Sequence, residues 1–361
     1  MENSNNRVFY YDVIRLIACL SVLTIHFNAS FSAYSGNVFI YPNAVFPNYI
    51  FHQSVYLGDF GVSLFFILSG AAMFRTYGKR DVSLGSFYKK RFLSFYPMFW
   101  LAWFVATAVG MLVTEGLPSG GIGALLTSLS GMDGYLMALG YSGFSLFYKV
   151  GEWFLGCIIL LYLIMPLLLW GMKRKPILTL GLGILTAVLF HAETGIFFLR
   201  RIPEILIGMA FDRYFIPQRG KWRGVWALGA LTGIVVFSWM GPKLLAIGYG
   251  LELCVAISTL CFLLLALLFQ ETPATELTRL VNGLSQYTYP AFLVHHQVCE
   301  YMAGRFYLPE LPKLTLYFSF LVYLGITAAL SVLLVRMSRP ITAWLKCLLF
   351  REKGKKDVMD H

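Results

Sequence analysis

Three polar side chains with chemical potential lie in the first apolar stretch of the chain, YYDVIRLIACLSVLTIHF: Asp12, Arg15 and His26. A charged group inside a membrane helix costs ~2.5–3.5 kcal/mol, so such a group marks a candidate functional site. At ~100° and ~1.5 Å per residue, Arg15 and His26 share one helix face and lie about 16 Å apart along the axis. A guanidinium suits phosphate binding, and an imidazole titrates near neutral pH and suits general base catalysis. Asp12 lies one turn from Arg15 and can pair with it.

This spacing suggests how a ligand would bind along the helix. A molecule entering from the cytoplasm could have its anionic head held by Arg15 and extend a thin arm towards His26. In the alternative, Asp12 and Arg15 form an ion pair at the membrane surface and His26 is a packing histidine. The helix alone leaves both interpretations open.

Further polar residues lie in later apolar stretches. Glu152 opens GEWFLGCIILLYLIMP, His295 and His296 lie in YTYPAFLVHHQV, and FFLRRIPEIL holds the charged residues Arg200, Arg201 and Glu204. Adjacent helical residues point ~100° apart, so we expect only one of the two histidines to face the protein interior. A helix–helix hydrogen bond is the alternative role for His296. No His-x-x-x-His, Glu-x-x-His or Cys-x-x-Cys spacing occurs, which predicts that no metal binds.

Two other segments allow more than one interpretation. In GVSLFFILSGAAMF the small residues favour close helix approach or a backbone kink, and Ser69 is either a nucleophile or bonded to the preceding turn. The basic run that ends at Arg91 precedes FLSFYPMFW. Its side chains either extend to lipid phosphates or help to hold a phosphorylated cofactor.

Composition determines which kind of element carries these residues. Of 361 residues, 58% are hydrophobic and 13% are charged, against roughly 45–50% and ~25% in soluble domains. Apolar runs of ~20 residues recur along the chain, which excludes a soluble protein and, since they do not alternate, an outer-membrane barrel. We predict an all-α polytopic integral membrane protein with about ten transmembrane helices, at 9–27, 54–74, 92–113, 152–172, 176–191, 197–216, 224–241, 244–269, 287–307 and 315–336.

Charge indicates the orientation of the chain. The net charge of +11 is explained by the positive-inside rule rather than by nucleic acid, because 22 of the 29 basic residues fall on one side of the predicted helices. Both termini are therefore expected in the cytoplasm. We predict one transmembrane domain over residues 1–350 and a short charged cytoplasmic tail over 351–361. The longest outer connection, about 114–151, is glycine-rich and is either a re-entrant or lid segment or a loose surface loop.

Four segments, taken in order, resemble the membrane acyltransferase family called acyltransferase 3. YYDVIRLIACLSVLTIHF is similar to its first helix, with Arg15 and His26 at the positions of an Arg-x10-His signature. GDFGVSLFFILSG, YKKRFLSFYPMFWL and TYPAFLVHHQV resemble three further family segments, with His295 at a family histidine. The chain departs from the family at Ser94, where many relatives have arginine, and at Phe292, where tyrosine is common.

The resemblance implies transfer of an acyl group, often acetyl, from cytoplasmic acyl-CoA to a hydroxyl of a cell-envelope glycan or its lipid-linked precursor. It implies catalytic roles for His26, as base or acyl carrier, and Arg15, and acyl-CoA binding by Arg15 and Arg91. The supporting candidates are Asp12, Ser69, Glu152, Trp153 and His295. Many relatives carry an extracellular hydrolase-like domain after the last helix. None follows here, so we expect transfer to be completed in the membrane domain or on a separate partner.

We therefore expect a multi-pass O-acyltransferase of the cell (cytoplasmic) membrane. Acyl-CoA, as acetyl-CoA, is its donor substrate, and no cofactor is expected to stay bound. Its expected partners are the glycan or lipid-linked acceptor and membrane lipids, with no nucleic acid; a homo-oligomer or an extracytoplasmic partner protein stays open. The alternative function is a secondary transporter or exporter of a glycan or lipid-linked substrate. The absence of a convincing repeat between the two halves disfavours transport.

Overall fold

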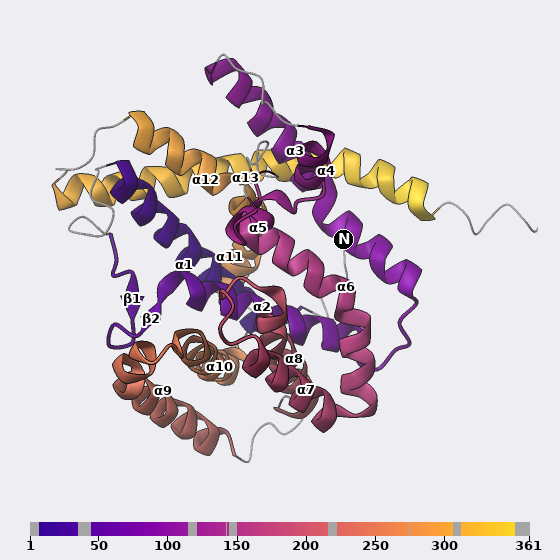
Figure 1. Cartoon of the computed structure of the whole chain (residues 1–361), viewed down its shortest axis with the longest axis vertical. Helices are drawn as coiled ribbons and strands as arrows, with labels where there is room; N and C mark the ends of the chain where they lie inside the picture. Colours follow the sequence, from indigo (N-terminus) through magenta and orange to yellow (C-terminus); the bar gives the residue numbers. More distant parts are fainter. Residues whose placement is uncertain are drawn as a thin grey trace, which may run out of the picture.

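The computed structural model describes residues 7–34, 45–114, 121–141, 143, 150–215, 222–273, 275–305 and 312–350. These residues are almost entirely helical (Figure 1). Within them, one short antiparallel hairpin, β1 (Tyr49–Ile50) and β2 (Val55–Tyr56), precedes the second long helix. The predicted tail over 351–361 lies outside the described residues.

Each of the ten predicted membrane segments contains helix. They correspond to α1 (Phe9–Tyr34), α2 (Leu57–Tyr77), α3 (Leu84–Thr114), α6 (Glu152–Arg174), α7 (Pro176–Leu189), α8 (Ile202–Ala210), α9 (Arg223–Ala246), α10 (Gly250–Phe269), α12 (Thr288–Arg305) and α13 (Lys313–Phe350). The predicted helix 197–216 is broken into three parts, a 3-10 turn at Phe198–Arg201, then α8, then a π-helical turn at Phe211–Phe215.

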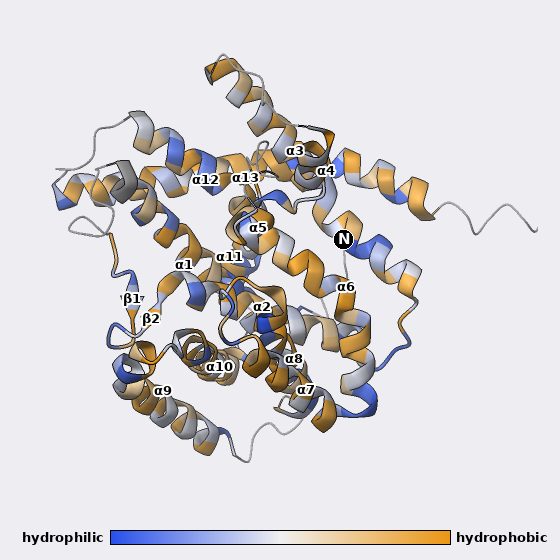
Figure 2. Ribbon diagram, in the orientation of Figure 1, coloured by the Kyte–Doolittle hydropathy of each residue, from blue (hydrophilic) through white to orange (hydrophobic). Residues whose placement is uncertain are grey.

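Seven of the described helices are long and apolar enough to cross a membrane, namely α1, α2, α3, α6, α9, α10 and α13. α7 has 14 residues and α8 has nine, both short of the ~20 that a full span needs. Figure 2 shows that hydrophobic residues predominate along α6, α7 and α9, where many large apolar side chains are exposed. A lipid environment covers such surfaces. The chain is thus an all-α, multi-pass membrane protein, and ten spans with cytoplasmic termini stay predictions.

The core forms around α2, which packs against α1, α8 and α10. Two glycines allow α2 and α8 to touch backbone to backbone. A Cβ on Gly70 would meet the carbonyl oxygen of Ile205, and a Cβ on Gly208 would meet that of Ile67. The close helix approach predicted from the small residues after Ser69 is therefore confirmed.

Much of the glycine-rich connection is folded. α4 (Ile122–Leu129) and α5 (Asp133–Ala138) form a helical pair, and α5 packs on α6. Trp103 Nε1 donates to Ser128 Oγ at 2.8 Å, and Ser128 Oγ donates to Asp133 Oδ2 at 2.6 Å. Burial raises the pKa of Asp133, opposed by the hydrogen bonds that its carboxylate accepts from Ser128 Oγ and the Gly134 backbone N–H. The loose-loop alternative is wrong for residues 121–141, while Gly116 and Gly120 lie outside the described residues.

Candidate active site

Asp12 organises the end of α1 that we expect near the cytoplasm. Its buried carboxylate accepts from Arg15 Nη1 at 2.7 Å, Arg7 Nε at 2.6 Å and Ser285 Oγ at 2.6 Å. Ser285 ends α11 (Glu276–Ser285), a short helix that the sequence analysis did not predict. The predicted Asp12–Arg15 pair is confirmed, and one carboxylate orients two guanidinium groups.

Arg91 reaches the neighbourhood of Arg15 from α3. Its guanidinium carbon lies 5.7 Å from the ring centre of Tyr162 and 5.9 Å from that of Phe87. Among the described residues, its buried Nε has no hydrogen-bond partner. Arg15 lies within electrostatic range of the same Tyr162. Arg91 of α3 thus borders an aromatic side chain of α6, and Arg15 of α1 lies within electrostatic range of it, an arrangement that fits an anionic ligand.

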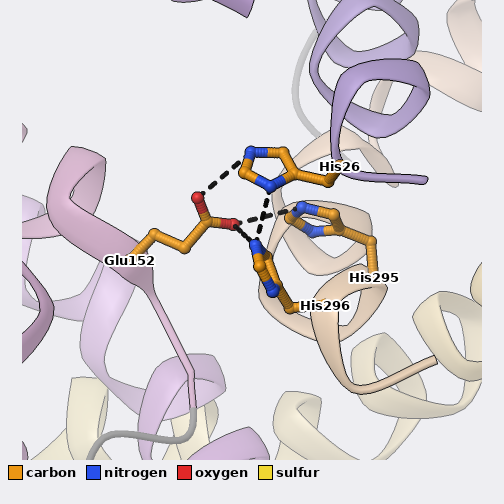
Figure 3. A group of neighbouring side chains, drawn as sticks. All are labelled: His26, Glu152, His295 and His296. Carbon is orange, nitrogen blue, oxygen red and sulfur yellow. Dashed lines mark hydrogen bonds and ion pairs between the residues drawn. The ribbon is translucent and has the colours of Figure 1, made fainter. Parts of the chain in front are cut away.

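The other end of α1 brings His26 to a cluster built from three helices, shown in Figure 3. His26 Nε2 lies 3.2 Å from Glu152 Oε2, at the start of α6. On α12, His295 Nε2 and His296 Nε2 lie 3.2 and 3.1 Å from Glu152 Oε1. His296 Nε2 and His26 Nδ1 are 2.7 Å apart. The structure therefore brings together three predicted site residues, with His26 and His295 both in contact with the Glu152 carboxylate.

The expectation that only one of the paired histidines faces the interior was wrong. Because the Glu152 carboxylate lies between two side chains that diverge by ~100°, both reach the same oxygen. His295 is fully buried, whereas the His296 side chain is 26% exposed. Sequence reasoning missed His296 as a site residue, although the His-His pair in an apolar helix was the signal. One turn further, Glu300 Oε1 lies 3.5 Å from His296 Nδ1.

The backbone that carries Glu152 is strained. Its φ is +40°, in the left-handed region that residues with a Cβ rarely adopt, and it follows Gly151 at φ +102°. Such a conformation costs about 1–3 kcal/mol and occurs mainly where function requires it. The Glu152 side chain is only 8% exposed, so a strained helix start directs a nearly buried carboxylate at three imidazoles.

A family model described as an acyltransferase domain, acyltransferase 3, matches residues 8–336. The chain belongs to the acyltransferase 3 family. Comparison with curated proteins gave no match, and neither did comparison with solved structures. The matched range contains Asp12 with Arg15 and Ser285, as well as Arg91 and the four residues of the His26 cluster, while Arg7 lies just before it. The protein is therefore a membrane acyltransferase, as the four resembling segments implied.

The remaining candidates in the acyltransferase lie in different surroundings. The Trp153 ring lies 5.7 Å from the guanidinium carbon of Arg201. Arg201 is fully buried and pairs with Asp59 and Glu204, each at 3.1 Å, so Trp153 links Glu152 to a buried ion-pair network. Ser69 is half-buried on α2, and within the described chain no hydrogen bond connects it to a histidine or carboxylate. The structure therefore does not bring Ser69 into the cluster.

The acyltransferase also brings together groups that can ligate a metal. One ligand atom each from His26, Glu152, His295 and His296 lies within 4.8 Å of all the others. We expected no metal from the spacing of residues along single helices. That argument did not cover a cluster assembled from α1, α6 and α12, so the absence of a metal stays an untested prediction.

Proposed function

We propose that this acyltransferase moves an acyl group, of which acetyl is the simplest, from cytoplasmic acyl-CoA to a hydroxyl of a cell-envelope glycan or its lipid-linked precursor. In this proposal it works in the cell membrane. The observation that supports it most directly is the contact between His26 Nε2 and the nearly buried Glu152 Oε2 at 3.2 Å, inside the matched family domain. A histidine fixed by a carboxylate is a common general base.

The donor is proposed to bind at the cytoplasmic end of α1. Arg15 and Arg91 would pair with the phosphates of acyl-CoA, because guanidinium groups bind phosphate through parallel hydrogen bonds. Asp12 fixes the direction of Arg15 and leaves part of its guanidinium available, since the Arg15 side chain is 33% exposed. The pantetheine arm would then extend along α1 towards His26, across the axial gap of about 16 Å.

The reaction is proposed as direct transfer with His26 as the base. The acceptor hydroxyl oxygen attacks the thioester carbonyl carbon while His26 takes the hydroxyl proton. The new C–O ester bond forms and the C–S bond breaks, and the CoA thiolate leaves and takes up a proton. The Glu152 carboxylate stabilises the imidazolium that His26 becomes during the attack.

The acceptor is proposed to approach from the side where the cluster is open. His26 and His296 are each about one quarter exposed, and Glu300 beyond them is 54% exposed. This end of α1 is opposite the end that holds Arg15, so donor and acceptor would reach the cluster from opposite membrane faces. Such an arrangement acylates an extracytoplasmic hydroxyl without moving CoA across the membrane.

The test is mass spectrometry of surface glycans from host strains that differ only in this protein. The strains are a deletion host and the same host carrying the parent, His26→Ala or His191→Ala, at matched membrane abundance. His191 is a suitable control, because it also faces a carboxylate, Glu252 Oε1 at 3.1 Å, outside the cluster.

We expect an acyl ester in the strains with the parent and with His191→Ala, and in no other strain. The mass increment identifies the acyl group. Equal modification by His26→Ala and by the parent would contradict the role of His26. No ester in any strain would contradict the proposed acceptor and favour transport.

A further inference from the structure

The two oxygens of Glu152 face different partners. Oε2 faces His26 Nε2 at 3.2 Å. Oε1 faces the Nε2 atoms of His295 and His296 at 3.2 and 3.1 Å. The cluster in Figure 3 therefore has two sides, one with a single imidazole and one where two imidazole nitrogens and a carboxylate oxygen meet.

The contact at Nδ1 of His295 determines which of its two ring nitrogens carries the hydrogen. Nδ1 lies 2.8 Å from the carbonyl oxygen of Phe292. A carbonyl oxygen only accepts, so Nδ1 carries a hydrogen and a neutral ring presents a lone pair at Nε2. That Nε2 and Glu152 Oε1 are buried, and within the described parts of the chain neither has a hydrogen-bond partner despite their separation of 3.2 Å.

Two lone-pair atoms facing each other at this distance repel, unless a cation lies between them. A proton on Nε2 would form a hydrogen bond to Oε1, but the angles at this contact do not have hydrogen-bond geometry. A metal ion bonded to both atoms would satisfy them together. Both atoms are buried, which increases the cost of leaving them unpaired.

We propose that Glu152 Oε1, His295 Nε2 and His296 Nε2 bind a zinc ion. Imidazole and carboxylate are zinc ligands, and two histidines with one glutamate form a known type of catalytic zinc site with an open fourth position. Bonds of about 2.0–2.1 Å in tetrahedral geometry separate ligand atoms by roughly 3.4 Å. The observed separations from Glu152 of 3.1 and 3.2 Å are close to this value.

Groups around the three proposed ligands are arranged as the neighbours of metal ligands usually are. Metal-binding histidines usually donate their second N–H to a carbonyl or carboxylate, which fixes the ring. His295 does so to Phe292, and the second nitrogen of His296 faces Glu300 at 3.5 Å. The ligating carboxylate is in turn bonded to His26 through its other oxygen.

The ion would change the environment of His26. With His296 Nε2 bonded to zinc, His26 Nδ1 loses its partner at 2.7 Å and becomes free to accept a substrate proton. The open fourth position would lie next to this nitrogen and would suit a substrate oxygen. The zinc site follows from the geometry of the cluster and does not rest on acyl transfer.

The test measures metal directly on the full chain, purified without a histidine tag. The parent, Glu152→Gln, His295→Gln and His191→Gln are grown with added zinc and passed through metal-free buffer, and metal is counted by mass spectrometry. We expect one zinc per chain in the parent and in His191→Gln, and about tenfold less in the other two variants. Titration of the metal-free parent with cobalt should give the visible spectrum of a four-coordinate ion that zinc displaces.

The proposal fails if the parent neither retains zinc nor gives a cobalt spectrum, or if His295→Gln retains as much metal as the parent. The cobalt titration uses unaltered protein, so a variant that fails to fold does not decide the question. Zinc binding without glycan acylation would contradict the proposed function alone. Acylation by a parent without bound metal would contradict the zinc site alone.

Discussion

Replacing Glu152 by glutamine removes the charge from the centre of the cluster with little change in shape. The carboxylate contacts three imidazoles at 3.1–3.2 Å, and the proposed reaction requires His26 to become positively charged beside it. The variant therefore weakens an interaction that is strongest in the transition state. Such a change lowers kcat more than it raises KM.

The size of the effect can be worked from the His26–Glu152 distance. Two unit charges 3.2 Å apart attract by about 5 kcal/mol at an effective dielectric constant of about 20. A neutral acceptor retains about half of a charge-assisted hydrogen bond. The loss is then about 2.5 kcal/mol, which corresponds to about a 10²-fold lower rate.

The assay is release of CoA thiol from acetyl-CoA by purified protein supplied with envelope extract, against a boiled control. Glu252→Gln is the matched control, because Glu252 also bonds a histidine and an arginine, at 3.1 and 2.9 Å, outside the cluster. We expect the control to keep the parental rate. A Glu152→Gln rate within about threefold of the parent would refute the proposed electrostatic role.

Three other changes give separate readouts. Arg15→Lys should raise the KM for acyl-CoA about tenfold at normal abundance, because lysine cannot bind phosphate in a bidentate manner. An unchanged KM would contradict a role of Arg15 in donor binding. Gly208→Ala should lower the free energy of unfolding in detergent by about 1–3 kcal/mol, because the new Cβ meets the backbone of Ile67. Gly229→Ala, where no atom of the described residues lies within 4 Å of the added Cβ, should be neutral, and equal melting of the two variants would contradict the close packing. Ser69→Ala should keep most of the CoA release, and its complete loss would support Ser69 as a nucleophile.

Local patterns predicted the long apolar helices and the ion pair within α1, but not the short helices α4, α5 and α11. Apolar runs long enough to cross a membrane predicted the positions of ten helical segments. This worked because the rise per residue of an α-helix fixes how many apolar residues a membrane helix needs. The Asp12–Arg15 pair was equally predictable, because residues three apart are neighbours on one helix. Family resemblance suggested the proposed roles of Arg15 and His26, which the residues alone left open.

Contacts between helices were not predictable in the same way. Helical periodicity gives the angle between His295 and His296 but not the position of a third group, so it could not show that Glu152 lies between them. Ser285 meets Asp12 from a short helix far along the chain. For the connection that holds α4 and α5, the abundant glycine left a re-entrant or lid segment and a loose loop equally open, whereas hydrogen bonds from Trp103 and within the pair stabilise a folded structure.

The left-handed backbone at Glu152 lowers the stability of the fold at a residue that the proposed reaction needs. Glycine at this position would relieve about 1–3 kcal/mol of strain and remove a nearly buried charge, so a screen for heat resistance is expected to enrich it. The surviving protein would carry three imidazoles with no carboxylate between them and, by the proposed mechanism, would be inactive. Directed evolution of this acyltransferase therefore needs selection for turnover at every round, because stability alone leads away from the enzyme.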